Sequence, residues 1–546
     1  MAIETPYSKL CALIVDDMAV QQTTLRGQLT MLGIGKVEQA TTAEDAIRML
    51  RTGRHNLVLC DYNLEHTTDG QQLFEHLRES NLLSPDCLFF MVTAENNYAA
   101  VASASEHKPD AYLLKPITAA DVGERLKSAL ERRRVFQAVS AALARQDLAA
   151  ALQANDEVLA RRDRWALHAL QQKGQLLLQM GRHEEAKGVY QAALAQRPQL
   201  IWAQLGLARS LKAAGLFEEA KHIARDIVES QDGQRTMAAY DVLAESLEAQ
   251  GDTGAAQWVL RDAATMVPSV KRQRLLADCA FRNGDVDTAL EVLGKVTRAT
   301  RGSIVAQAQD TLSLAQALVD AGRPAEGLSL LDQPLARGSG PAAQQESVVM
   351  ALKAQAYARL GDRDRAVQAV GRAREVLRNA KADFATVALA KAELVTGNES
   401  DGLRLLAAAV SSDHENPRVR QLVRMALRDT GHEDKMDHLV EAAAATLTGR
   451  VADAKAMFRN SRIDEALSAI ESALKDYPEN TGVLLQAAQM NCLSLRLKKQ
   501  ANAAVVDRVR LYLARLDKLM PGSDRVTQMQ RYFRETLSAL AEPAAA

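Results

Sequence analysis

The sequence predicts a doubly wound α/β domain with a parallel sheet over residues 1–130, followed by an all-α superhelical solenoid. Two observations support this division. Before Leu130, short apolar runs alternate with amphipathic stretches, which is typical of βα units around a parallel sheet. After Leu130, strand-like runs fade, and the strong helix formers Ala, Leu, Arg, Gln and Glu dominate.

The composition excludes several classes of protein. Of the 546 residues, 47% are hydrophobic and 25% are charged, which is typical of globular rather than disordered chains. The formal net charge is −1, so no chain-wide basic field favours non-specific nucleic-acid binding. Five scattered cysteines without CxxC spacing indicate reduced thiols, and no apolar run approaches 18 residues. We therefore expect a soluble cytoplasmic protein without membrane insertion.

Four apolar runs in the first part are expected to be strands, at Leu10–Val15, Asn56–Cys60, Cys87–Val92 and Ala111–Leu114. Amphipathic stretches lie between them, for example Ala43–Leu50 and Gly70–Arg78, and are expected to be helices. Connections of this kind make neighbouring strands parallel.

Polar residues stand where these strands end. Asp16 and Asp17 follow the first run, Asp61 the second, Thr93 the third and Lys115 the fourth. The carboxyl ends of strands in an open α/β sheet form one crevice, so these side chains should converge. Clustered carboxylates repel one another, whereas Mg²⁺ prefers oxygen ligands. The cluster predicts a magnesium site.

This set resembles the receiver domain of bacterial two-component response regulators, over residues of about 8–130. The matching elements are Asp16-Asp17, the Cys60–Leu64 segment followed by Asp69-Gly70, Thr93-Ala94, and Lys115-Pro116 with Tyr112 three residues before Lys115. The resemblance implies a flavodoxin-like, five-stranded sheet. A degenerate, unphosphorylatable receiver is disfavoured because all five functional positions hold the chemical types of the family.

The resemblance also implies residue roles. Asp61 would accept a phosphoryl group from a sensor histidine kinase or phosphotransfer protein, forming an acyl phosphate. Asp17, Asp61 and the backbone carbonyl of Asn63 would bind Mg²⁺ directly, and Asp16 would act mainly through a water.

Further roles implied by the family concern the phosphorylated state. Lys115 and the Thr93 hydroxyl would contact phosphoryl oxygens. Tyr112 would then turn inward and reshape the surface of the fourth helix, fifth strand and fifth helix. Asn63 and Glu95 would flank the attacking water, which suggests fast self-dephosphorylation. The bond before Pro116 is commonly cis in this family.

The second part contains a repeat. A Gly is followed five positions later by a small residue, with starts 33 to 39 residues apart. These pairs are Gly181/Ala186, Gly215/Ala220, Gly251/Ala256, Gly284/Ala289, Gly322/Gly327, Gly361/Ala366 and Gly397/Gly402, with weaker copies at Gly431/Met436 and Ser461/Ala466. The period resembles tetratricopeptide repeats, in which the Gly would end one helix and the small residue would allow the next to pack closely. We expect eight or nine repeats, irregular from Gly284 onward.

These features predict four regions: a receiver over 1–130, a helical connector over 131–150, tetratricopeptide-like repeats over 151–480, and C-terminal helices with a frayed tail over 481–546. No Gly or Pro lies between Gly123 and Gly174, so the last receiver helix could continue into the connector.

The leading functional hypothesis is a phosphorylation-controlled adaptor whose repeats bind an unknown downstream protein. The alternatives are a transcription regulator whose repeats contact DNA or RNA polymerase, and an enzyme with a receiver switch. A nucleic-acid reader such as a helix-turn-helix and a second catalytic cluster are both missing from the sequence patterns, so we expect a non-enzymatic signalling protein without nucleic acid. A homodimer stays open, because receivers and helical arrays both self-associate.

Overall fold

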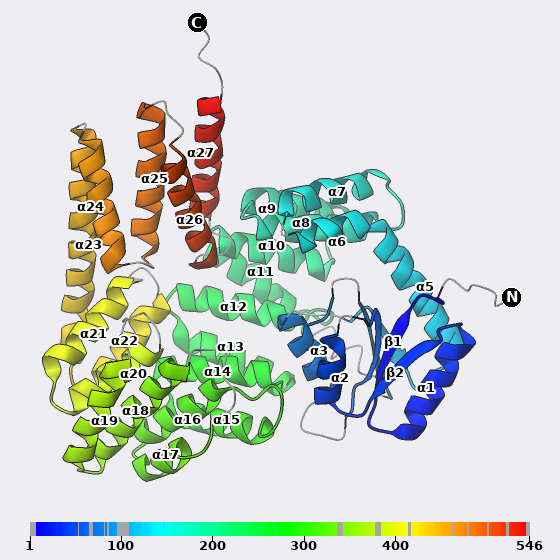
Figure 1. The fold of residues 1–546 in the computed structure, drawn as a ribbon, viewed down its shortest axis with the longest axis horizontal. Coiled ribbons are helices and arrows are strands. Elements are labelled where there is room, and N and C mark those ends of the chain that lie inside the picture. The colour runs from blue at the N-terminus through cyan, green and yellow to red at the C-terminus, as the bar shows by residue number, and fades with distance from the viewer. Residues whose placement is uncertain are drawn as a thin grey trace, which may run out of the picture.

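The computed structural model describes most of the chain, namely residues 7–52, 54–64, 69–80, 82–84, 87–94, 109–145, 147–267, 269–335, 342–376, 384–412, 417–460, 462–477, 480–498, 502–519 and 524–541. It divides into an N-terminal α/β domain and a long helical array (Figure 1). The predicted fold class is therefore confirmed.

The N-terminal domain is a five-stranded sheet in the order β2-β1-β3-β4-β5, in which every neighbouring pair is parallel. Its strands are β1 (Cys11–Val15), β2 (Lys36–Ala40), β3 (Leu57–Asp61), β4 (Leu88–Thr93) and β5 (Ala111–Leu114). Its described helices are α1 (Ala19–Met31), α2 (Ala43–Leu50), α3 (Gly70–Glu79) and α5 (Ala119–Val135).

The four predicted strands all form, each within one residue of the expected bounds. Hydropathy gave no signal for β2, because this edge strand has the polar sequence Lys-Val-Glu-Gln-Ala and only Ala40 is buried in it. Only the family resemblance, which implies five strands, indicated that a strand such as β2 exists besides the four apolar runs.

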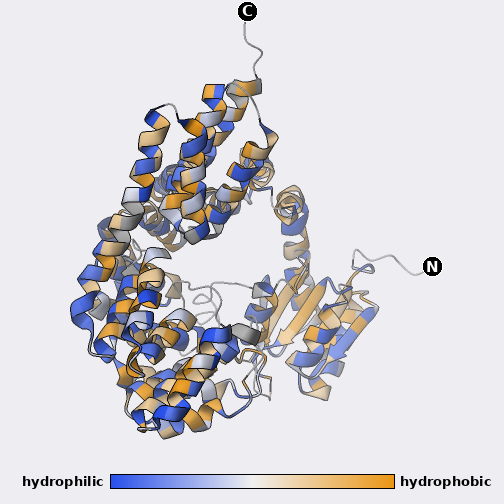
Figure 2. Ribbon diagram, turned by 60° about the vertical axis from the view of Figure 1, so that its left-hand side comes forward, coloured by the Kyte–Doolittle hydropathy of each residue, from blue (hydrophilic) through white to orange (hydrophobic). Residues whose placement is uncertain are grey.

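The sheet separates two apolar cores. One packs α1 and α5 against it, through residues such as Leu29 and Leu126. The other, here called the α2–α3 core, contains Ile47 of α2, Phe74 of α3 and Phe89 of β4. The buried strands appear orange in Figure 2, whereas the helices alternate between apolar and polar residues. Both faces of the parallel sheet are thus covered.

Helix α5 passes into the array with only a one-residue break. Phe136 ends α5 and precedes α6 (Gln137–Ala144). Its ring packs edge-on against Trp165 and His168, with ring centroids 6.5 and 4.9 Å away. The expected near-continuous connection is present, and aromatic packing fixes its angle.

The helical array begins with α6 and continues to the C-terminal helices. Its further helices are α7 (Leu148–Ala160), α8 (Ala166–Gln179), α9 (His183–Gln196), α10 (Ile201–Ala213), α11 (Phe217–Glu229), α12 (Met237–Ala249), α13 (Thr253–Met266), α14 (Val270–Asn283), α15 (Val286–Ala299), α16 (Ala308–Asp320), α17 (Pro324–Leu331), α18 (Ala342–Arg359), α19 (Arg363–Val376), α20 (Phe384–Val395), α21 (Glu399–Ser412), α22 (Pro417–Asp429), the 3₁₀ turn η1 (Glu433–Lys435), α23 (Met436–Arg459), α24 (Ile463–Asp476), α25 (Thr481–Lys498), α26 (Ala503–Leu519) and α27 (Asp524–Ala541).

The predicted glycines lie in the turns between paired helices. All eight have positive φ, as expected for residues that end a helix in the left-handed conformation: Gly181, Gly215, Gly251, Gly284, Gly322, Gly361, Gly397 and Gly431. The small residues five positions later are buried at the helix contacts, for example Ala186 and Ala220. Ser461 lies outside the described residues.

The later part of the array departs from regular stacking, as expected. Helix α21 packs against α23 directly, and α22 also contacts α12 and α14, which lie much earlier in the chain. The Gln421 side-chain amide donates to Asn283 Oδ1 at 2.6 Å across this contact. The array therefore curls until α22 meets α14.

The last helices form a separate cluster with α23 and α24 (Figure 1). Tyr512 of α26 and Phe533 of α27 are buried in its core. Among the described helices, none combines the length and apolarity needed to cross a bilayer.

Candidate functional site

The carboxyl ends of four strands meet at one edge of the sheet. Asp16 directly follows β1, Asp61 and Thr93 are the last residues of β3 and β4, and Lys115 follows β5. Lys115 Nζ lies 3.0 Å from Asp61 Oδ2 and 3.6 Å from Asp16 Oδ2. The structure brings together the residues that the strand ends predicted.

Three carboxylates form the centre of this site. Ligand atoms of Asp16, Asp17 and Asp61 all lie within 4.8 Å of one another. The Asp16 side chain is fully buried, that of Asp61 is 8% exposed, and Asp17 is half-buried. Three acids so close together carry more negative charge than Lys115 alone can balance.

Burial dominates the electrostatics of this cluster. It raises the pKa of Asp16 and the pKa of Asp61, and the nearby ammonium of Lys115 opposes both shifts. The charge of Asp17 raises the pKa of Asp16 further. The ionised cluster is therefore incompletely compensated and favours a bound cation.

The donor set fits a hard divalent cation. Asp16 Oδ2 is buried and accepts no hydrogen bond, so a lone pair remains available in the cluster. Carboxylate oxygens with room for water are the ligands that Mg²⁺ prefers. The acidic cluster is typical of the magnesium site of receivers.

Gln22 is a supporting residue that sequence reasoning missed. Its side-chain amide donates to the carbonyl oxygens of Asp16 and Ala40, at 2.5 and 3.0 Å. The Met18 amide donates to Asp16 Oδ1 at 2.9 Å. The available signal was spacing, because Gln22 shares the buried face of α1 with Leu25 and Leu29.

Gly70 allows a close backbone approach to Asp61. A Cβ at this position would overlap the carbonyl oxygen of Asp61. The Gly70 amide donates to the Tyr62 carbonyl at 2.8 Å, which ties the start of α3 to the end of β3. The family motif contains Asp69-Gly70, but this reason for the glycine needs the structure.

Three other predicted site residues, Thr93, Tyr112 and Asn63, lie in β4, in β5 and just after β3. Thr93 is buried, and the Lys115–Pro116 bond is cis, as expected. Asn63 is exposed just beyond β3. Tyr112 is half-buried at the rim of the α2–α3 core, where burial and then Glu75 raise its pKa. Glu95 lies outside the described residues.

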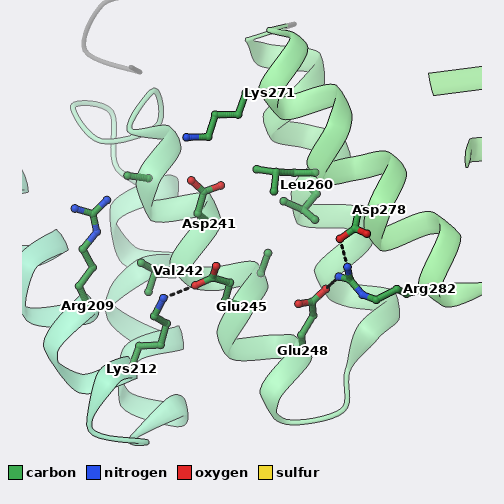
Figure 3. Close-up of a pocket in the computed structure, with 13 residues that line it drawn as sticks. Arg209, Lys212, Asp241, Val242, Glu245, Glu248, Leu260, Lys271, Asp278 and Arg282 are labelled. Atoms are coloured by element: carbon green, nitrogen blue, oxygen red, sulfur yellow. Dashed lines mark hydrogen bonds and ion pairs between the residues drawn. The ribbon is translucent and has the colours of Figure 1, made fainter. Parts of the chain in front are cut away.

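A second concave feature lies in the array, between α10, α12 and α14 (Figure 3). It has a volume of about 290 Å³ and is lined by charges of both signs. Lys212 pairs with Glu245, and Arg282 pairs with Glu248 and Asp278. Arg209 extends into the same space. Apolar side chains such as Val242, Leu260 and Leu275 also line this groove.

Comparisons with known proteins match both parts of the chain. The response regulator receiver domain family matches residues 12–127, and two tetratricopeptide repeat families match residues 177–240 and 242–304. The N-terminal part is similar to chemotaxis protein CheY-3 of Vibrio cholerae and to a probable chemotaxis protein CheY of Rhizobium etli. Each is 29% identical, over 120 and 123 residues respectively, covering 22% of this chain and 91% of the relative.

Among solved structures, the chain is similar to a tetratricopeptide repeat protein from Parabacteroides merdae, with 13% identity and a TM-score of 0.31. That match covers 48% of this chain and 98% of the other. Both modules are typical of signalling proteins rather than enzymes. The strand-end acids, the sheet order and the family matches together show that this chain is a CheY-like response regulator receiver domain followed by tetratricopeptide repeats.

Proposed function

We propose that this protein is a response regulator that accepts a phosphoryl group on Asp61 and signals by binding a protein through its repeats. The observation that carries this proposal is the placement of Asp61 beside Asp16, Asp17 and Lys115 at the strand ends. The supply of the phosphoryl group by a sensor histidine kinase or phosphotransfer protein follows from the resemblance to receivers.

In this proposal Asp61 is the nucleophile. A carboxylate oxygen attacks the phosphorus of a phosphohistidine, the P–N bond breaks, and its electron pair returns to the imidazole nitrogen of the donor. The product on this chain is an acyl phosphate. Mg²⁺ held directly by Asp17, Asp61 and the Asn63 carbonyl, and by Asp16 mainly through a water, would supply positive charge that offsets the phosphoryl oxygens.

Two side chains would hold the product. Lys115 Nζ, now 3.0 Å from Asp61 Oδ2, is close enough to pair with a phosphoryl oxygen instead. The buried Thr93 hydroxyl, at the end of the neighbouring strand, would donate to another oxygen. Tyr112 would report this rearrangement, and Asn63 and Glu95 would set the rate of hydrolysis.

The repeats would supply the binding surface for the downstream protein. The groove of Figure 3 supports this, because its charged lining offers ion pairs and hydrogen bonds to a peptide. We keep the predicted regions 1–130, 131–150, 151–480 and 481–546 as proposed boundaries. We also place the protein in the cytoplasm, because all five cysteines are free thiols.

The test is phosphate incorporation from acetyl phosphate with Mg²⁺, followed by mass spectrometry of the intact chain and its peptides. We expect one phosphate on the peptide containing Asp61, and none in Asp61→Asn. Asp45→Asn is the matched control, because Asp45 is a carboxylate of α2 that pairs with Arg48 at the surface. Unchanged incorporation in Asp61→Asn would overturn the proposal.

The transcription-regulator alternative is distinguished by a mobility-shift assay at several salt concentrations. Binding through phosphate contacts weakens steeply as salt rises. We expect no such salt-dependent complex.

A further inference from the structure

The receiver touches the array at a second place, far from the α5–α6 connection. Ile304, in the loop between α15 and α16, packs against the α2–α3 core of the receiver. Figure 1 shows α2 and α3 on the side of the receiver that faces α13 and α14, whereas α1 lies on the opposite side. The contact therefore joins two parts of the chain that are more than 200 residues apart.

The loop that carries Ile304 is held firmly by the array. Arg274 of α14 donates to the Val305 carbonyl at 2.6 Å and pairs with both carboxylate oxygens of Asp310, at 2.9 and 2.7 Å. Thr300 and Ser303 are buried at its base. These contacts fix the conformation of the loop, so Ile304 is held in position by the array itself.

The other attachment of the receiver is also rigid. Glu131 of α5 forms an ion pair with Arg164, next to the packing of Phe136 against Trp165 and His168. The receiver is consequently held at two points, one at the start of the array and one at the loop between α15 and α16.

The second attachment lies on the core that also contains the switch region. Tyr62, which directly follows Asp61, and Tyr112 of β5 both pack at the rim of the α2–α3 core, as Ile304 does. A rearrangement of either tyrosine would act on the same set of buried side chains against which Ile304 packs. Packed cores respond to such changes by switching between discrete arrangements rather than by bending gradually.

We propose that Ile304 docks on the α2–α3 core in the unphosphorylated protein and that phosphorylation of Asp61 releases it. This inference rests on the proposed function, since it needs Asp61 to be the phosphorylated residue. It assigns the output to the α2–α3 side, in addition to the surface of the fourth helix, fifth strand and fifth helix that the family resemblance implies. Release would leave the receiver attached to the array at the rigid α5–α6 connection.

Coupling between two sites is reciprocal, and this provides a quantitative test on the full chain. The first measurement is hydrogen exchange of the peptide covering residues 300–307, with and without beryllofluoride and Mg²⁺. The second is the affinity for beryllofluoride, measured by fluorine NMR, in the wild type and in Ile304→Asp. Leu360→Asp is the matched control, because Leu360 is an apolar residue in another interhelical turn and is 51% exposed.

We expect beryllofluoride to speed exchange of this loop at least about fivefold, the lower end of typical allosteric coupling. Ile304→Asp should tighten beryllofluoride binding by a similar factor, whereas Leu360→Asp should leave it unchanged. If beryllofluoride binds but loop exchange is unchanged or slower, the inference is wrong and the proposed function stands. If no beryllofluoride binds at Asp61, the proposed function fails as well.

Discussion

Asp16 is a carboxylate without exposure to solvent, and few groups compensate its charge. One of its oxygens accepts the Met18 amide, and the other has only the Lys115 ammonium, 3.6 Å away. An ionised carboxylate in this position destabilises the fold unless a cation is bound. The residue is suited to ligand binding and contributes little to stability.

This leads to a pH-dependent prediction for Asp16→Asn without Mg²⁺. Because burial raises the folded-state pKa of Asp16 above its ordinary value of 3.8, the folded protein binds more protons than the unfolded one. Stability must then fall as pH rises through the folded-state pKa. We expect Asn to stabilise the receiver by roughly 1 kcal/mol at pH 7 and by nothing near pH 3.

The measurement is hydrogen exchange of β1 and β3 in the presence of a chelator, because Trp165, Trp202 and Trp258 all lie in the array and cannot report on the receiver. With Mg²⁺ added, the wild type should become more stable than Asp16→Asn, because the cation binds the ionised carboxylate. If the wild type is more stable than Asp16→Asn at pH 7 in chelator, the prediction that ionised Asp16 destabilises the fold is wrong.

How far the site could be predicted depends on the kind of residue. Asp16, Asp61 and Lys115 were predictable because a general rule places strand ends together. Gln22 and Gly70 were not, because their roles depend on the distance to one backbone carbonyl. Such distances are set by packing, which hydropathy patterns do not encode.

At the scale of the elements, two glycines of the array differ in backbone conformation, one in a turn and one inside a helix. Gly251 has a φ of 85° in the turn between α12 and α13, and Gly254 lies three residues later within α13. A Cβ at either position meets no atom within 4 Å. Steric overlap is therefore absent at both, and only backbone conformation distinguishes them.

We predict that Gly251→Ala destabilises the array by about 1 kcal/mol, since an L-residue is strained in the left-handed region. Gly254→Ala should stabilise it by about 0.5–1 kcal/mol, because Ala favours a helix. Urea denaturation followed by tryptophan fluorescence checks both, since Trp258 lies in α13. Equal effects of the two substitutions would refute the left-handed turn at Gly251.

The turns of the array could be located from the sequence, whereas strand β2 could not. The period of Gly and small residues located the turns because each turn needs a positive φ within a few residues of chain. Strand β2 gave no such signal, since its stability comes from pairing with β1 rather than from burial of its own side chains.

At the scale of the whole molecule, the curled part of the array is fixed by a buried ion cluster. Lys391 of α20 is 3% exposed and pairs with Asp320 at 2.8 Å and with Asp429 at 3.0 Å. These partners belong to α16 and α22, so one side chain links three helices. Neither this link nor the Ile304 contact follows any sequence period, because both depend on how far the array curls.

Lys391→Met should therefore destabilise the packing of α22 strongly. It leaves the buried Asp320 without this cation and Asp429 with the more distant Arg428, at 3.9 Å, and breaking a buried ion pair typically costs about 3–5 kcal/mol. Lys353→Met is the control, because Lys353 pairs with the exposed Asp332 and should cost at most about 1 kcal/mol. Hydrogen exchange of α22 measures both, and similar protection in the two variants would disprove the role of Lys391.

The meeting of α22 with α14 also limits how this chain can evolve. Solenoids usually gain or lose whole units by duplication, because each unit touches only its neighbours. Here, inserting one helix pair between α14 and α22 would carry Gln421 away from Asn283, and an insertion between α16 and α20 would also carry Lys391 away from Asp320. Homologues should keep the length of this stretch constant and vary in unit number after α24.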